Sequence, residues 1–108
     1  MAVTVADSGS QTATISTEHT LSTITTAGVY TLAVDSAALA AGDSVVLRVY
    51  GKARSADTER LIFESAFSDV QGDPLKLSFT VVSPHHFKAT LQQTAGTGRA
   101  FPWAVYAA

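Results

Sequence analysis

The sequence predicts an all-β fold, an antiparallel β-sandwich or jelly-roll-like domain of about eight strands. Apolar and polar residues alternate with a period of two over short segments, which is typical of strands that bury one face. Val and Thr, which favour strands, recur along the whole chain. Turn-forming residues such as Gly, Pro, Asp and Ser separate the segments at intervals that favour two packed antiparallel sheets.

The length of the chain fits one domain. With 108 residues, of which 46% are hydrophobic, the chain has the size at which a single core forms. We assign this domain to residues 11–108. Residues 1–10 are rich in Ser, Ala and Gly, and we expect them to form a flexible N-terminal arm.

The predicted strands are residues 11–16, 18–25, 28–35, 43–53, 59–68, 75–82, 86–94 and 99–107. In the third and fourth of these segments the alternation directs six apolar side chains to the core: Tyr30, Leu32, Val34, Val45, Leu47 and Val49. Arg48, Tyr50 and Lys52 of the fourth segment then point outward. Between the two segments, residues 36–41 predict a single helical turn that Gly42 ends.

The later segments repeat the alternation, and in the fifth, seventh and eighth the residues expected to face the core are Leu61, Phe63, Phe67, Phe87, Ala89, Leu91, Phe101, Trp103 and Val105. The sixth segment is the most regular, with Leu75, Leu77, Phe79 and Val81 on one face. We therefore expect Phe79→Ala to cost roughly 3 to 5 kcal/mol. Because Pro102 cannot donate to a ladder, the last strand is expected at a sheet edge or after a bulge.

Composition excludes several classes of function. The chain has no cysteine, which excludes disulfides, thiolate metal sites and cysteine nucleophiles. The net charge is −2 and the Lys and Arg residues are scattered, so we expect no nucleic-acid partner. There is no signal-peptide pattern and no apolar run approaching the roughly 20 residues that span a bilayer, so we expect neither export nor a membrane partner.

Residues that could carry catalysis are few and poorly placed. His85 and His86 are adjacent, so on a strand they point to opposite faces and cannot readily bind one metal together. His19 is the only other histidine, and no nucleophile elbow accompanies any serine. The loop with Gly96 and Gly98 lacks the Lys-Ser/Thr ending of a phosphate loop and predicts a turn. We expect a protein that is not an enzyme and has no catalytic residues, metal or cofactor.

Two residues stand apart from the rest. Most of the nine acids lie in or beside turns, where Asp caps the backbone, but Glu64 lies mid-strand and predicts a surface ion pair with Arg48 or Lys76. Trp103 offers a surface on which a sugar could stack. Its alternation with apolar neighbours indicates instead a place in the core or in a subunit interface.

An outward row formed by Arg48, Tyr50, Lys52 and Arg54 is the candidate partner-binding site. It places an aromatic ring among cations, and Arg and Tyr are favoured at interface hot spots. Three further cations would extend it: Arg60, Lys76 and Lys88. Such a face suits an acidic protein surface or a glycan, and the alternative is a solvated face without a partner.

Four segments carry a resemblance to a known class of proteins. They are TAGVYTLAVD at 26–35, AGD at 41–43, LRVY at 47–50 and QTAGTGRAFPW at 93–103. Together they resemble small virion structural proteins of tailed bacteriophages, of the head decoration or capsid cement type. The resemblance covers roughly residue 26 to the C-terminus, is most specific in its final segment, and carries no known binding residues.

The resemblance implies a protein that binds the outside of an assembled capsid and reinforces the joints between coat subunits. The implied partner is the major capsid protein of the same phage, and the implied state is a homo-oligomer in the virion, assembled in the host cytoplasm. Two alternatives stay open. One is a phage tail or neck adaptor, and the other is a small carbohydrate-binding β-sandwich module.

Overall fold

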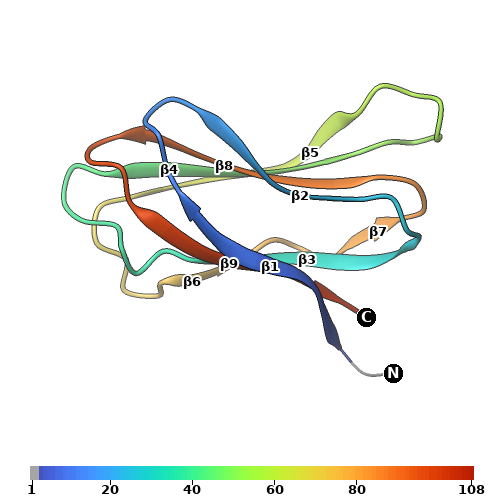
Figure 1. Cartoon of the computed structure of the whole chain (residues 1–108), viewed down its shortest axis with the longest axis horizontal. Coiled ribbons are helices and arrows are strands. Elements are labelled where there is room, and N and C mark those ends of the chain that lie inside the picture. The colour runs from blue at the N-terminus through green and yellow to red at the C-terminus, as the bar shows by residue number, and fades with distance from the viewer. Residues whose placement is uncertain (1–2) are drawn as a thin grey trace.

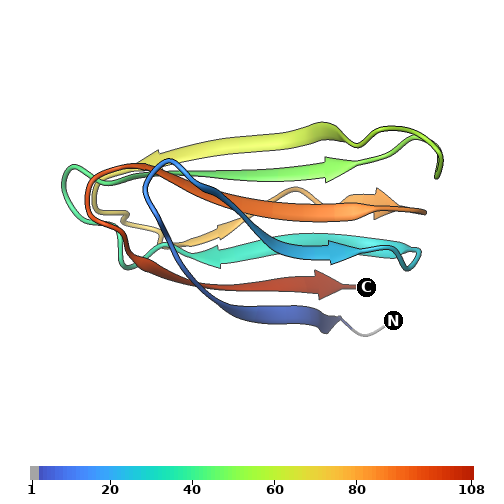
Figure 2. The ribbon, with the colours of Figure 1, turned by 45° about the horizontal axis from the view of Figure 1, so that its top comes forward.

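The computed structural model describes residues 3–108, which form nine strands and no helix. The strands are β1 (Thr4–Thr12), β2 (Glu18–Ile24), β3 (Gly28–Asp35), β4 (Ser44–Gly51), β5 (Arg60–Ser68), β6 (Leu75–Leu77), β7 (Val81–Ser83), β8 (Phe87–Ala95) and β9 (Ala100–Ala107). They build two layers that face one another (Figures 1 and 2).

One layer, the β9 sheet, has the order β1-β9-β3-β6, with β7 also paired to β3. The other, the β8 sheet, has the order β2-β8-β4-β5. Every pair is antiparallel. The chain thus runs as one long hairpin that is wound into two sheets. Its paired strands are β1 with β9, β2 with β8, β3 with β6 and β7, and β4 with β5. This is the topology of a jelly roll, so the predicted fold class is confirmed.

The core lies between the two sheets, and the inward faces predicted for β3, β4 and β8 are confirmed. Their apolar residues Tyr30, Leu32, Val34, Val45, Leu47, Val49, Phe87, Ala89 and Leu91 are all buried. Phe101 and Val105 of β9 join them, and the rings of Tyr30 and Phe87 lie 5.3 Å apart. Each large side chain of this set contributes roughly 1.5 to 3 kcal/mol through removal of its surface from water.

The segment 75–82 differs from its predicted form, because it is divided into β6 and β7 by residues 78–80. Ser78 interrupts the ladder: its hydroxyl accepts the Leu32 N–H, and its own N–H donates to the Leu32 carbonyl, both at 2.9 Å. The register against β3 changes by one residue across this interruption. A one-residue change inverts which side chains face inward.

The inversion moves the predicted core residues of that segment to the surface. Leu75, Leu77 and Phe79 are 57%, 54% and 55% exposed, and of the four predicted inward residues Val81 alone is buried. A register shift between Val49 and Tyr50 acts in the same way on β5. It pairs Leu61 with the outward Tyr50, so Leu61 is exposed, whereas Phe63 and Phe67 are partly buried against the core.

The Phe79→Ala variant is now expected to cost about 1 kcal/mol instead of the larger loss that a core position predicts. The half-exposed ring keeps one edge-to-face contact, with Phe63 at 5.2 Å between centroids. Phe87→Ala is the matched control, because Phe87 is fully buried and should cost roughly 3 to 5 kcal/mol. Urea unfolding of both variants measures the difference, and equal losses would contradict the surface position of Phe79.

The chain ends also differ from expectation. Of the arm predicted at residues 1–10, Met1 and Ala2 lie outside the described residues, whereas Thr4 onward belongs to β1 and pairs with β9. The strand predicted at 11–16 is the end of β1 followed by a turn, in which Ser16 adopts a φ of 68°. The helical turn predicted at 36–41 is a pair of β-turns, closed by hydrogen bonds from Leu39 to Ser36 and from Asp43 to Ala40.

The prediction that Pro102 places its strand at an edge or after a bulge is wrong, because β9 lies between β1 and β3 and the register shift of its ladder with β1 lies at the other end, between Val5 and Asp7. The missing N–H is tolerated for a local reason. Pro102 pairs with Ser10 of β1, but the pairing of β9 with β3 extends only from Trp103 to Ala107. At Pro102 the ladder therefore has a partner on one side only, where proline is compatible with a strand.

Candidate functional site

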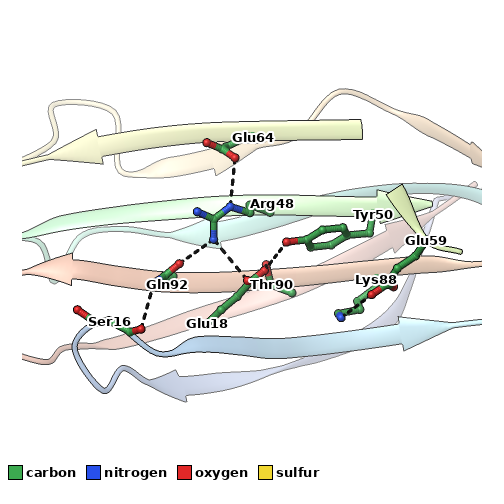
Figure 3. A network of polar contacts seen from close by, with 9 residues as sticks. All are labelled: Ser16, Glu18, Arg48, Tyr50, Glu59, Glu64, Lys88, Thr90 and Gln92. Atoms are coloured by element: carbon green, nitrogen blue, oxygen red, sulfur yellow. Dashed lines mark hydrogen bonds and ion pairs between the residues drawn. The ribbon is translucent and has the colours of Figure 1, made fainter. Parts of the chain in front are cut away.

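A charged network covers the outer face of the β8 sheet and links all four of its strands (Figure 3). Arg48 of β4 is at its centre. The Arg48 Nε lies 3.1 Å from Glu64 Oε2 on β5, and Nη1 lies 2.8 Å from Gln92 Oε1 on β8 and 3.6 Å from Glu18 Oε1 on β2. The predicted ion pair between Glu64 and Arg48 is confirmed.

Glu18 is the second hub of this network. One of its oxygens accepts hydrogen bonds from the Tyr50 and Thr90 hydroxyls, both at 2.6 Å. Burial alone raises the pKa of the Glu18 carboxyl, but the bonds from Thr90 and Tyr50 and the Arg48 charge outweigh it, so that pKa lies below its usual value. The same bond to Glu18, helped by burial, raises the pKa of Tyr50.

A second cluster lies beside the first, around Glu59. Lys88 Nζ donates to Glu59 Oε1 at 2.9 Å, and His86 Nε2 lies 2.8 Å from Glu59 Oε2. The bond from Lys88, followed by that from His86, lowers the pKa of the Glu59 carboxyl. The Lys88 ammonium also lies 5.1 Å from the ring centroid of Tyr50, which connects the two clusters. The ionic groups of this face are thus largely matched to one another.

The structure brings together only part of the predicted row Arg48, Tyr50, Lys52 and Arg54. Arg48 and Tyr50 lie on the outer face of β4, and both are held by contacts within the network. Lys52 follows the end of β4, and Arg54 lies in the next loop, where it pairs with Asp57 at 2.9 Å. Of the cations expected to extend the row, Lys88 joins the network, Arg60 lies at the end of the sandwich and Lys76 lies over the Phe67 ring.

The outer side of the β9 sheet has the opposite character, and we call it the apolar face. Alternation from the buried pair Leu32 and Val105 identifies its residues. They include Val5, Ser8, Ser10, Thr12, Val29, Thr31, Ala33, Asp35, Leu75, Leu77, Val82, Pro102, Ala104 and Tyr106. Asp35 is the one charged residue of this set.

A shallow groove of about 200 Å³ crosses the apolar face. One charged residue and six apolar ones line it: Asp35, Ala33, Leu75, Pro102, Trp103, Ala104 and Tyr106. Large apolar side chains remain exposed on both sides, namely Val5, Leu75, Leu77 and Val82. The sequence reasoning missed this face because it assigned the two leucines to the core. One signal was present, since Val82 is out of phase with the leucines and so predicts apolar residues on both sides of that segment.

Figure 1 shows the β4–β5 and β7–β8 connections at the same end of the sandwich. A pocket of about 330 Å³ opens between residues of these two connections. Its lining residues are Gly51, Lys52, Ala53, Arg60, Ile62, Val81, Val82, Ser83, Pro84 and His86. We call it the end pocket. Ser83 and His86 both line it, but His86 Nε2 contacts Glu59, and the Ser83 hydroxyl has no hydrogen-bond partner within residues 3–108. No hydrogen bond therefore joins a base to this serine.

The remaining candidate residues serve the fold. Trp103 is partly buried and packs against the core, where its ring also lies beside Gly9, so the predicted core role is confirmed. His19 accepts a hydrogen bond from the Thr14 N–H at 3.0 Å. In the part of the chain that the structure describes, no three His, Asp or Glu side chains gather as a metal site requires. That part also contains no helix long and apolar enough to cross a membrane.

Comparisons with known proteins identify no relative. No protein-family model, curated protein or solved structure matches the chain.

Proposed function

We propose that the protein is a structural protein of a phage virion, a head decoration or cement protein that binds the assembled capsid and stabilises it. The observation that carries the proposal is the apolar face. A small monomer rarely leaves large apolar side chains exposed around a groove unless that surface binds a partner. The jelly-roll topology supports the proposal by analogy of fold, because viral capsid domains use the same architecture.

The contrast between the two outer faces indicates which of them makes the contact. On the β8 sheet, Arg48 and Tyr50 are engaged by Glu18, Glu64 and other neighbours, and a partner would have to replace these contacts. On the apolar face, Leu77 and Val82 are exposed, and covering them removes apolar surface from water at about 25 cal/mol per Å². The apolar face is the proposed contact, and the row Arg48, Tyr50, Lys52 and Arg54 is its rival.

The proposed partner is the major capsid protein of the same phage, bound in the virion by a homo-oligomer. A protein that binds the intact lattice and not its dissociated subunits stabilises the lattice by mass action. At a hundredfold excess over Kd the gain is about 2.7 kcal/mol per site. Symmetric copies joined in an oligomer would turn a weak single contact into firm attachment.

Co-sedimentation with preassembled shells of the phage that encodes the protein tests the proposal. We expect the wild type to sediment with the shells and to raise their resistance to heat. Leu77→Asp should abolish this binding, because it places an unpaired charge within the proposed apolar contact. The matched control is Ala66→Asp, which adds the same charge at an exposed position of β5, in the other sheet, and should bind like the wild type.

A second variant, Arg48→Glu with Lys52→Glu, decides between the two faces. Loss of binding in this variant together with normal binding of Leu77→Asp would move the contact to the charged face. A wild-type protein that does not sediment with shells would contradict the cement function. In that case the two remaining candidate functions would be a tail or neck adaptor and a carbohydrate-binding module.

A further inference from the structure

The end pocket contains a polar group that its surroundings leave without a partner. Ser83 is 2% exposed, and its Oγ is the one buried side-chain polar atom of the described residues that makes no hydrogen bond. Burying a hydroxyl without a partner costs roughly 1 to 3 kcal/mol. Ser83 is also a lining residue of the end pocket, and its unpaired hydroxyl is explained if a bound molecule completes the hydrogen bond.

The positive charges of the end pocket are unmatched as well. Among residues 3–108, three cations form no ion pair with a carboxylate, namely Lys52, Arg60 and Lys76. Two of the three, Lys52 and Arg60, line the end pocket, whereas Lys76 lies over the Phe67 ring. The long stems of such side chains line apolar surface while their charged heads stay close to water. Two free cations at one opening favour an anionic ligand.

The rest of the lining is apolar. Ile62, Val81 and Pro84 form walls that suit a hydrocarbon group, and a volume near 330 Å³ lies within the range of small-molecule sites, about 300 to 1,000 Å³. A ligand that fits all three observations has an apolar body and a negatively charged group that accepts hydrogen bonds. A carboxylate meets these requirements, since it accepts from a hydroxyl and pairs with Lys or Arg.

We propose that the end pocket binds a carboxylate carried by a small apolar group. The Ser83 hydroxyl donates to a carboxylate oxygen, Lys52 and Arg60 neutralise the charge, and the apolar group lies against Ile62 and Val81. The proposal does not depend on the capsid-binding function, because the end pocket and the groove of the apolar face share no lining residue, although Val82 belongs both to the end pocket and to the apolar face. The carboxylate could belong to a free organic acid or to the C-terminus of a partner chain.

The test is a titration of the ¹⁵N-labelled protein followed by NMR, with 3-phenylpropanoate as the probe. We expect saturable shifts of the backbone amides of Gly51, Ile62 and Ser83, with a Kd of about 1 mM or tighter. The uncharged analogue 3-phenylpropanamide has nearly the same shape and should bind about tenfold more weakly. Absence of saturable shifts, or equal binding of acid and amide, would overturn the proposal.

Three variants assign the roles. Ser83→Ala should weaken the acid about fivefold to tenfold, yet leave the thermal midpoint unchanged or raised, because it removes an unpaired buried hydroxyl. Lys52→Met with Arg60→Met should weaken the acid about tenfold and abolish the effect of salt on its binding. Lys76→Met is the control for lost charge, since Lys76 lies over Phe67 away from the end pocket, and should bind like the wild type.

Two results would count against the assignment of Ser83. Unchanged affinity in Ser83→Ala would show that its hydroxyl does not contact the ligand, and a large fall in thermal midpoint would show that the hydroxyl has a structural partner. A second probe, N-acetyl-Ala-Phe with a free C-terminus, distinguishes the two sources of the carboxylate through its affinity for the end pocket. Tighter binding than 3-phenylpropanoate identifies a chain end, and weaker binding identifies a small organic acid.

Discussion

Gly96→Ala is expected to destabilise the protein by at least about 3 kcal/mol. Gly96 lies in the turn from β8 to β9 and has a φ of +89°, a conformation that residues with a Cβ rarely adopt. A methyl group there would also meet Asp43, with the Asp43 Cα only 2.8 Å away. Because Asp43 is itself fixed by hydrogen bonds, relief of the clash would break contacts that join the two sheets.

Two other glycines separate strain from steric conflict in this prediction. Gly42 has a φ of +88° but no neighbouring atom within 4 Å of an added Cβ, so Gly42→Ala should cost about 1 kcal/mol. Gly72 has neither feature, and Gly72→Ala should be near neutral. Urea unfolding of the three variants gives the comparison. A loss at Gly96 no greater than that at Gly42 would show that Asp43 can move without cost.

Asp43→Asn is expected to lower the thermal midpoint at neutral pH by roughly 10 °C. The buried Asp43 carboxylate accepts hydrogen bonds from the Ala40 N–H at 2.9 Å and the Thr97 N–H at 3.0 Å, and it pairs with Arg99 Nε at 2.7 Å. These contacts join the loop before β4 to the turn before β9. An amide keeps one acceptor oxygen, but it presents an NH₂ group to the remaining donors and leaves Arg99 without its counter-charge.

The effect of Asp43→Asn should depend on pH. The Ala40 N–H, followed by Arg99, holds the pKa of the Asp43 carboxyl below its usual value in the folded protein. The ionised group therefore contributes stability above the usual aspartate pKa of about 3.9. That contribution is lost as the pH falls through the lower pKa of the folded state, because both states then bind the proton.

Thermal unfolding of wild type and Asp43→Asn from neutral to strongly acidic pH checks this dependence. The two midpoints should be far apart at neutral pH and should approach one another in acid. Asp73→Asn is the control, since Asp73 is exposed in the loop before β6, and its midpoint should follow the wild type throughout. A difference that stays constant with pH would mean that the variant acts by shape and not by charge.

Sequence alternation predicted the central strands well and the outer strands poorly. The strands β3, β4 and β8 have neighbours on both sides, so side chains of one face are fully covered and the period of two matches burial. The strands β5 and β6 lie at sheet edges, where cover is partial. Their register shifts, beside Tyr50 and at Ser78, depend on contacts with strands distant in the sequence, which a local pattern does not contain.

The candidate sites show the same division. The pair Arg48 and Glu64 followed from alternation, because cross-strand partners on one face need only the correct phase of two neighbouring strands. The apolar face required the inversion at Ser78, which depends on hydrogen bonds to Leu32 of another strand. The end pocket combines residues from the end of β4, the start of β5 and the turn between β7 and β8, and no short segment carries its pattern.

The pairing of β1 with β9 has a consequence for how the chain folds during its synthesis. β1 is made before the other strands of this domain, yet among the described residues it pairs with β9 alone, which is made after them, and β2 likewise waits for β8. Contacts between such distant segments carry a large entropic cost of loop closure and slow folding. The hairpin of β4 and β5 joins neighbouring segments, so it can form early, and the two sheets then close outward from it toward the chain ends.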